Sequence, residues 1–291
     1  KNNDQFFLCG PSGEKPSLIN TTDLDFVRRI CKSSLRQINR NMAIKFIVDC
    51  FYSFENQLSG ISNQGLLSIH ELLHGTKKRN DWDYAKKKSL QVVDKSGNQL
   101  VSALGYEKKS IDNLTNLLLC SDERIALAVL LNEDEIAETQ SERFNNISPV
   151  SYAITKAEKE KLPWIIIIKG ETIRLYSTKN LGVGRRGRTE SYIECNPSFL
   201  SSDNLGLLWL IFSAEALKEN GSVEDILEES KRFSSDVAIK LRERIYDIVI
   251  PELSMGLVKA QKLTNNASND QLTLTYEMAL TVLFRLLFIA Y

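Results

Sequence analysis

Apolar residues recur at helical spacing in two segments near the N-terminus. The first segment runs from Thr22 to Asn39 and opens with Thr22-Asp23, residue types that cap helix N-termini well. The second runs from Met42 to Leu58 and is closed by Ser59-Gly60, a helix-stop signal. We therefore expect two helices. The aromatic residues of the second helix lie at helical spacing, which is more typical of a core than of a base-stacking platform.

The pattern changes in the middle of the chain. Residues 76–88 are mostly charged and polar, with cations on both sides of two aromatic residues, so they are interpreted as a solvated loop or, alternatively, a nucleic-acid contact. Residues 100–106 and 111–119 are expected to form two short helices around Gly105. The uninterrupted apolar run 125–131 predicts a buried strand.

The most strand-like residues follow a charged amphipathic helix, which is predicted for residues 152–162 and ends at Pro163. Residues 164–168 are almost all β-branched, and residues 172–176 alternate between apolar and polar types, so the two predict a hairpin. A third strand is expected at residues 191–195. These strands predict a small sheet.

The last third of the chain has a helical pattern throughout. Helices are predicted at residues 205–218, 223–249 and 276–291, with a shorter piece between the last two. Together with the strands, this pattern predicts an α+β N-terminal domain over residues 1–203, with a small sheet and flanking helices. An all-α helical connector is predicted over residues 204–291.

Composition limits the possible partners. The 291 residues are enough for about two domains, and 43% apolar with 25% charged residues is ordinary for a soluble globular protein. Lysines and arginines number 37, as do aspartates and glutamates, so the formal net charge is zero. Nucleic acid would therefore have to bind through a local patch. The five cysteines are dispersed, which is typical of reduced thiols and predicts a cytoplasmic protein.

The final stretch, Tyr276 to Tyr291, is an apolar helix without a stop signal. We expect further chain to follow it. The run from Met278 is too short to cross a bilayer and contains Arg285, so a buried helix that needs a partner surface is favoured over a membrane span.

Two histidines match a metalloprotease pattern. His70-Glu-Leu-Leu-His74 has the spacing His-Glu-x-x-His, which on a helix turns both imidazoles to one face. Gly75 stops the helix at once, three cations follow at residues 77–79, and the sequence contains no third histidine. A solvated helix end without metal is therefore favoured.

The best functional candidate is the loop between the second and third predicted strands, residues 179–189. It interleaves Gly182, Gly184 and Gly187 with arginines, a composition that lets the backbone approach a ligand while guanidinium groups bind phosphate. It can equally be a surface loop with scattered charge. The candidate nucleic-acid-binding residues, taken from this loop and the preceding hairpin, are Lys169, Arg174, Lys179, Arg185, Arg186 and Arg188.

Three segments carry a family resemblance. They are the final helix, the charged helix with Asp225-Ile-Leu-Glu-Glu-Ser230 and Leu241-Arg-Glu-Arg-Ile-Tyr246, and the hairpin Pro163 to Tyr176. They resemble the N-terminal region of type IIG restriction-modification enzymes and class I adenine-specific DNA methyltransferases, including relatives in the BREX and DISARM phage-defence systems.

This resemblance implies a nuclease-like N-terminal sheet and a helical connector into a methyltransferase domain that lies outside this sequence. It also implies that the whole protein transfers a methyl group from S-adenosylmethionine to adenine N6 in double-stranded DNA, and that other defence-system subunits are candidate partners. No S-adenosylmethionine site is expected within this segment, because no predicted strand is followed at a sensible distance by a glycine-rich cofactor-binding loop. Its expected role is to bind DNA or a partner.

Two further motifs are interpreted as turns. Gly10 to Ser17 has the composition of a phosphate loop, but its Gly and Lys are not adjacent and Pro16 stands where a helix would start. Cys195-Asn-Pro-Ser-Phe199 approaches the Asn-Pro-Pro-aromatic motif that holds a flipped adenine, but Ser198 replaces the second proline. We expect a strand end that enters a turn.

The alternative hypothesis is a divergent Mg²⁺-dependent nuclease. Such sites need an Asp and a Glu-x-Lys on adjacent strands. Glu171 to Arg174 has the wrong spacing and an arginine, and Glu158 to Lys161 has Glu160 where lysine is needed. Glu107-Lys-Lys109 with upstream Asp94 is a literal match, but we expect it in a turn between helices rather than on a strand.

Overall fold

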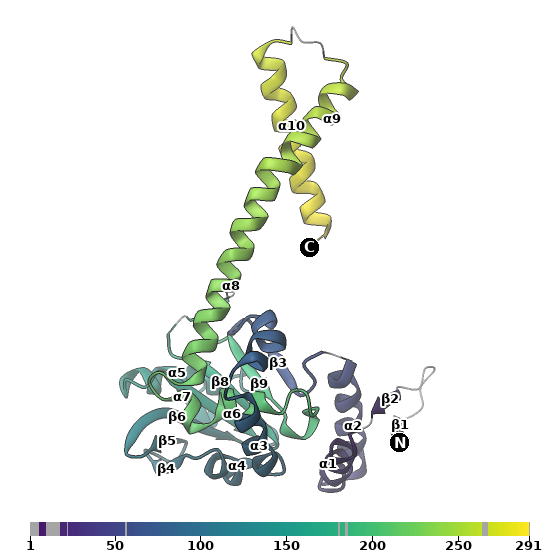
Figure 1. Ribbon diagram of the computed structural model, residues 1–291. Coiled ribbons are helices and arrows are strands. Elements are labelled where there is room, and N and C mark those ends of the chain that lie inside the picture. The colour runs from purple at the N-terminus through teal and green to yellow at the C-terminus, as the bar shows by residue number, and fades with distance from the viewer. Residues whose placement is uncertain are drawn as a thin grey trace. The chain divides into compact units, whose positions relative to one another are not determined.

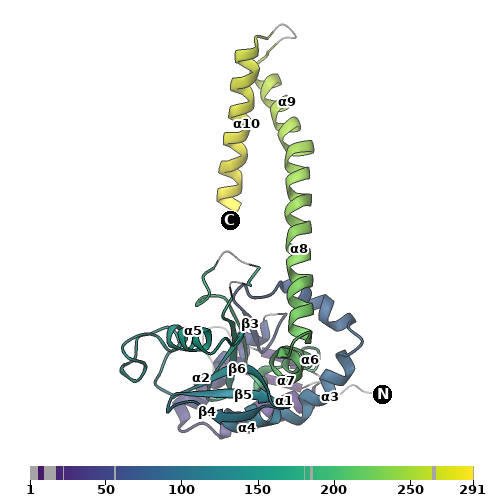
Figure 2. The ribbon, with the colours of Figure 1, turned by 90° about the vertical axis from the view of Figure 1, so that its left-hand side faces the viewer.

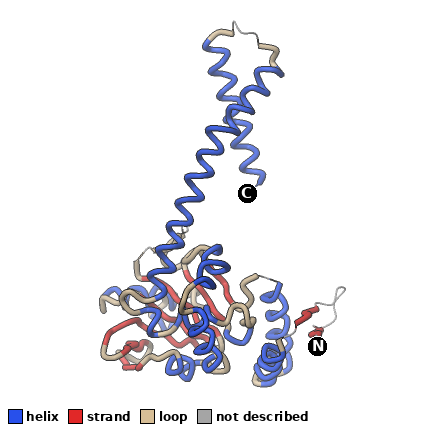
Figure 3. The backbone as a smooth tube through the Cα atoms, viewed as in Figure 1, coloured by secondary structure: helices blue, strands red, loops and turns tan. Residues whose placement is uncertain are grey.

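The computed structural model describes residues 6–9, 18–21, 23–55, 57–179, 181–183, 186–263 and 267–290 of the chain (Figure 1). It divides into two compact units, Lys1–Lys231 and Arg232–Tyr291. The first unit is built around a mixed sheet with flanking helices, and the second is helical (Figure 3). The expected α+β domain followed by helices is confirmed.

The sheet of the first unit has seven strands in the order β3-β9-β8-β7-β6-β5-β4. Strands β6 and β7 are parallel, and all other neighbours are antiparallel. The predicted hairpin is β7–β8, and the other predicted strands are β6 and β9. The strand bounds are β3 Ile61–Asn63, β4 Glu107–Ser110, β5 Thr115–Cys120, β6 Glu123–Leu131, β7 Trp164–Lys169, β8 Thr172–Ser177 and β9 Tyr192–Cys195.

The centre of the sheet is buried on both faces. In β7, Trp164 through Ile168 are all buried, which explains why this strand is an apolar run rather than an alternating one. The crossover from β6 to β7 contains α5 (Pro149–Lys159), whose N-cap Ser148 accepts a hydrogen bond from the Ser151 amide. Its apolar side packs with Phe144 against one face of the sheet.

Helices α3, α4, α6 and α7 cover the other face (Figure 2). Helix α6 is buried along its whole length, and the Tyr106 hydroxyl donates to the Phe212 carbonyl at 2.9 Å. The first residues of α8 (Ser222–Arg244) complete this layer through Val223, Ile226 and Leu227. The bounds are α3 Trp82–Val92, α4 Gly97–Ala103, α6 Gly206–Phe212 and α7 Ala214–Leu217.

The two predicted N-terminal helices are present as α1 (Leu24–Leu35) and α2 (Arg40–Glu55), which follow the short hairpin β1 (Phe6–Cys9) and β2 (Leu18–Thr21). They pack against the 3-10 turn Pro197–Phe199 at the end of β9. Arg29 Nη2 donates to the Leu200 carbonyl at 2.6 Å, and the rings of Phe46 and Phe199 lie 4.8 Å apart.

Several predictions for the middle of the chain were wrong. Residues 115–120, expected within a short helix, are the strand β5, and residues 107–110, expected as a turn between helices, are the strand β4. The apolar run of β5 is buried in the sheet, and Ser121 and Asp122, both with positive φ, turn the chain into β6. Residues 82–92 are not a loop: α3 turns Ala85, Ser89 and Val92 into the core, and its lysines lie on the outer side.

The second unit contains the rest of α8, a π-helical turn at Ile245–Val249, α9 (Ile250–Ala260) and α10 (Asn269–Ala290). Helices α9 and α10 pack together through a few residues, among them Ala279 and Leu283, while most large apolar side chains of α10 are exposed. Helix α10 begins at Asn269 and has 22 residues, so it is longer than the run from Met278. An 18-residue window within it has a mean hydropathy of 1.6, which makes the helix long and apolar enough to cross a membrane. Length and composition alone do not distinguish a span from a helix covered by protein.

The start of β5 is tied to α5 by an ion pair, with Asp112 Oδ2 2.9 Å from Lys156 Nζ. Burial alone would raise the pKa of Asp112, but hydrogen bonds from Lys156 and from the residues at positions 114 and 115 lower it to about 2. A lowered folded-state pKa stabilises the fold above the unfolded value of about 4, and this contribution is lost as the pH falls from about 4 to about 2.

We therefore expect Asp112→Asn to lower the free energy of unfolding by about 1–2 kcal/mol at pH 7 and to flatten its pH dependence between about pH 2 and 4. Urea denaturation at a series of pH values measures both effects. Asp83→Asn, at an exposed position of α3, is the control. Equal stability of the two variants at pH 7 would show that the Asp112 pair contributes nothing.

Candidate functional site

The loop that follows β8 carries two exposed cations. Lys179 lies directly after the β8 end, and Arg186 Nη1 donates to Gln64 Oε1 at 2.5 Å. Among the residues that the structure describes, neither forms an ion pair with an acidic side chain. Both charges are therefore available to an anionic partner. Gly184 and Arg185, which belong to the same predicted site, lie outside the described residues.

Arg188 holds this loop to the domain. Its guanidinium forms an ion pair with Glu158 of α5 and donates to the Thr178 carbonyl at 2.8 Å. Two elements that are distant in sequence are joined in this way. Arg188 thus has a structural role that the sequence does not reveal.

Arg174 is also engaged within the fold. Its guanidinium pairs with Glu194 on β9 and with Glu138 at 2.5 Å, and it lies 4.7 Å from the centre of the Tyr192 ring. Burial alone would lower the pKa of Arg174, but Glu194 raises it well above its usual range. The side chain is permanently charged and already neutralised.

Lys169 has a partner as well, because its ammonium donates to the Glu135 carbonyl at 2.6 Å. Of the six candidate residues, Lys169, Arg174 and Arg188 are therefore used to hold the domain together. Among the candidates that the structure describes, Lys179 and Arg186 are the exposed ones without an ion pair, although Arg186 donates a hydrogen bond to Gln64.

The histidine pair lies on a π-helical turn, Glu71–Gly75, with both rings exposed and their centroids 5.2 Å apart. A Cβ on Gly75 would lie 2.0 Å from the Glu71 carboxylate, so a larger residue there would require the Glu71 side chain to move. Within the described part of the chain, no three His, Cys, Asp or Glu side chains gather in a group that could hold a metal ion.

The possible nuclease motif has a different setting from the one expected. Glu107 and Lys109 lie on β4, an exposed edge strand, so the expectation of a turn was wrong. Their cross-strand neighbours on β5 are Leu119 and Leu117, whose side chains cannot bind a metal ion. Asp94 lies 3.8 Å from Lys32 of α1. The adjacent strand therefore supplies no carboxylate to Glu107.

The segment Cys195 to Phe199 is a strand end that enters a turn, as predicted. Asn196 caps the 3-10 turn by accepting a hydrogen bond from the Ser198 amide, and Phe199 packs against α2. Cys195 is fully buried, and burial raises the pKa of its thiol well above the usual range.

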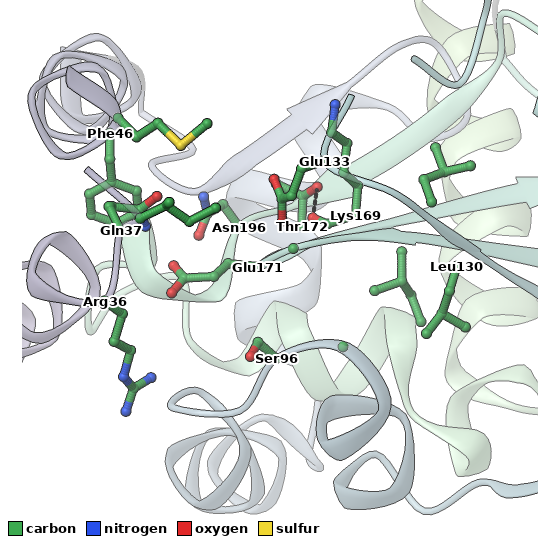
Figure 4. A pocket seen from close by; sticks show the side chains of 16 residues that line it. Arg36, Gln37, Phe46, Ser96, Leu130, Glu133, Lys169, Glu171, Thr172 and Asn196 are labelled. Carbon is green, nitrogen blue, oxygen red and sulfur yellow. Dashed lines mark hydrogen bonds between the residues drawn. The ribbon is translucent and has the colours of Figure 1, made fainter. Parts of the chain in front are cut away.

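A cavity of about 550 Å³ was not predicted from the sequence (Figure 4). It lies between the α1–α2 pair and the carboxyl ends of the parallel strands β6 and β7. Its walls combine apolar side chains such as Phe46 and Leu130 with the carboxylates of Glu133 and Glu171. The sequence contained part of the signal for this cavity, because both glutamates follow apolar strands. It did not show that α2 packs beside the ends of these strands.

Comparison with protein-family models, curated proteins and solved structures finds no match for this chain. The geometry of its own residues is therefore the basis for its proposed function.

If Arg174 holds β8, β9 and the segment around Glu138 together, Arg174→Ala should lower the free energy of unfolding by about 1–3 kcal/mol, because it leaves two carboxylates without their partner. Arg174→Lys should recover only part of this loss, since an ammonium group cannot reproduce the forked contacts. Lys179→Ala should change stability by less than about 0.5 kcal/mol. Chemical denaturation of the three variants makes the comparison, and equal effects of both alanine substitutions would contradict the assignment.

Proposed function

We propose that this chain is the DNA-binding N-terminal module of a larger adenine-specific DNA methyltransferase in a restriction-modification or phage-defence system. The observation that carries the proposal is the pair of exposed cations without an ion pair, Lys179 and Arg186, on the loop after β8. The neighbouring candidates Arg174 and Arg188 are paired with carboxylates, and Lys169 donates to a carbonyl. Two positive charges thus lie exposed on a loop that Arg188 holds in place.

The order of the parts supports the proposal. The family resemblance implies a domain with a sheet, closed by a hairpin and followed by a helical connector. In the structure, the hairpin β7–β8 lies in the interior of the sheet, and the chain continues through α8, α9 and α10. The hairpin segment that carries the resemblance is thus a hairpin in this structure, and the two other segments are helical.

The proposed contact is with the phosphate backbone. Lysine and arginine on a loop bind phosphate oxygens through charge-assisted hydrogen bonds, and such contacts position a protein on DNA without reading its sequence. The formal net charge of the chain is zero, so affinity would come from this patch and not from a general field. Recognition of a target sequence would belong to other parts of the whole protein.

The second unit supports the proposal that the chain works as part of a larger assembly. Phe284 and Phe288 of α10 are 65% and 86% exposed, and apolar side chains occupy almost every position around the end of this helix. A group of neighbouring exposed apolar side chains is typical of an interaction site. We propose that a methyltransferase domain covers this surface and carries the S-adenosylmethionine site.

Salt-dependent DNA binding tests the proposal. Each phosphate contact releases about one counterion, so Lys179→Ala with Arg186→Ala should lower the slope of log K against log salt by roughly 2. The loss of affinity should be similar for all duplex sequences, because phosphate contacts carry no sequence information. Fluorescence anisotropy at several salt concentrations measures both quantities.

A matched control removes the same charge elsewhere. Lys77→Ala with Lys78→Ala alters two exposed lysines of the 3-10 turn before α3 and should leave the slope unchanged. Equal slopes for the parent and the Lys179/Arg186 variant would refute the proposed contact. Cleavage of the duplex in Mg²⁺ that disappears in Glu107→Gln would instead establish the nuclease alternative.

A further inference from the structure

The cavity beside α2 has two carboxylates without a cationic partner. Glu133 follows the end of β6, and Glu171 lies in the turn between β7 and β8. Because β6 and β7 are parallel, their carboxyl ends lie at the same edge of the sheet, and both side chains line the cavity (Figure 4). Within the described residues, neither glutamate forms an ion pair with a lysine or arginine.

The two cations at the cavity are directed elsewhere. Lys169 donates to the Glu135 carbonyl, and Arg36 lies 3.4 Å from the Asp94 carbonyl oxygen. Figure 4 shows the ammonium of Lys169 and the guanidinium of Arg36 pointing away from Glu171. A nearby carboxylate gives a useful comparison: Glu135 is buried and paired with Arg143 at 3.0 Å. Glu133 and Glu171 have no such neutralisation.

The position of Glu171 is fixed by the fold. Its Oε2 accepts a hydrogen bond from the Ser198 hydroxyl at 3.0 Å, which leaves Oε1 without a hydrogen bond from the described residues. Glu133 lies close to the β7–β8 turn, whose residue Gly170 has φ +54°. A Cβ there would lie 3.1 Å from Glu133 Oε1. The turn therefore allows both carboxylates to face one cavity.

The walls of the cavity are suited to an aliphatic chain. Phe46 and Met42 of α2 form one side, and Leu130 and Ile168 from the ends of β6 and β7 form the other. At about 550 Å³, the cavity is within the range of small-molecule and side-chain binding sites. The carboxylates of Glu133 and Glu171 only accept hydrogen bonds, so they favour a ligand that donates them.

We propose that this cavity binds an organic cation, a short aliphatic chain that ends in an ammonium or guanidinium group, with Glu133 and Glu171 as the charged partners. A lysine or arginine side chain of a partner protein and a free polyamine share this chemistry. The site is distinct from the proposed DNA contact, because the β7–β8 turn and Lys179 lie at opposite ends of β8.

Calorimetric titration of the full chain at low salt tests the proposal. The probes are the acetylated methylamides of lysine and arginine, spermidine, and the acetylated methylamide of norleucine, which has a similar side chain without the charge. We expect the cationic probes to bind and norleucine to fail. Binding of the two amino-acid probes without spermidine would identify a protein side chain as the ligand, and the reverse result a polyamine.

Three variants locate the site. Glu133→Gln and Glu171→Gln should each weaken cation binding by about 10- to 100-fold, since each removes a charged hydrogen-bond acceptor. Glu107→Gln on β4, the charge-matched control, should change it by less than about twofold. Glutamine at position 171 can still accept from Ser198, and Glu133 is exposed, so both variants should unfold at the same temperature as the parent.

Several results would overturn the proposal. They are no heat from any cationic probe at millimolar concentration, equal binding of norleucine, or equal weakening by Glu107→Gln. Binding of Mg²⁺ that depends on Glu133 and Glu171, with no binding of the organic cations, would make this a metal site instead. None of these results depends on whether the loop after β8 binds DNA.

Discussion

The parallel pairing of β6 with β7 is the constraint on which the first unit depends. Parallel neighbours need a crossover, and the crossover places α5 on one face of the sheet. A strand pair in the middle of a sheet must then be covered on its other face too, which α3, α4, α6 and α7 achieve. The apolar run in β7 follows from this double burial, since a strand with one wet face would alternate.

The same pairing determines where chemistry can occur. Side chains beyond the carboxyl ends of β6 and β7 meet at one edge, where the α1–α2 pair closes over them, and a cavity with two carboxylates results. At the other end of β8, Arg188 anchors the following loop to the crossover helix and leaves Lys179 and Arg186 exposed. One sheet thus presents a pocket with two unpaired carboxylates at one end of a strand and a loop with exposed cations at the other.

The sequence predicted the central strands because their signals are local. The β-branched run of β7, the alternation of β8 and the turn between them need no tertiary information, and the predicted hairpin is present. Strand β5 was missed because its apolar residues are also compatible with a short helix, and only pairing with β6 decides between them. Helix α3 was missed because its many lysines hide a narrow buried side at Ala85, Ser89 and Val92.

Charge on a loop is a weaker guide than the pattern of a strand, because the sequence shows which residues are cationic but not which have partners. Arg174 and Lys179 look alike in the sequence. In the structure, the carboxylates of Glu194 and Glu138 hold Arg174, whereas Lys179 is exposed. The same holds for acids, since Glu135 is paired and Glu133 is not. In a chain with equal numbers of both charges, the groups that the fold leaves unpaired are the candidates for binding a charged ligand. That set is decided by long-range contacts, so it is visible only once the strands are placed side by side.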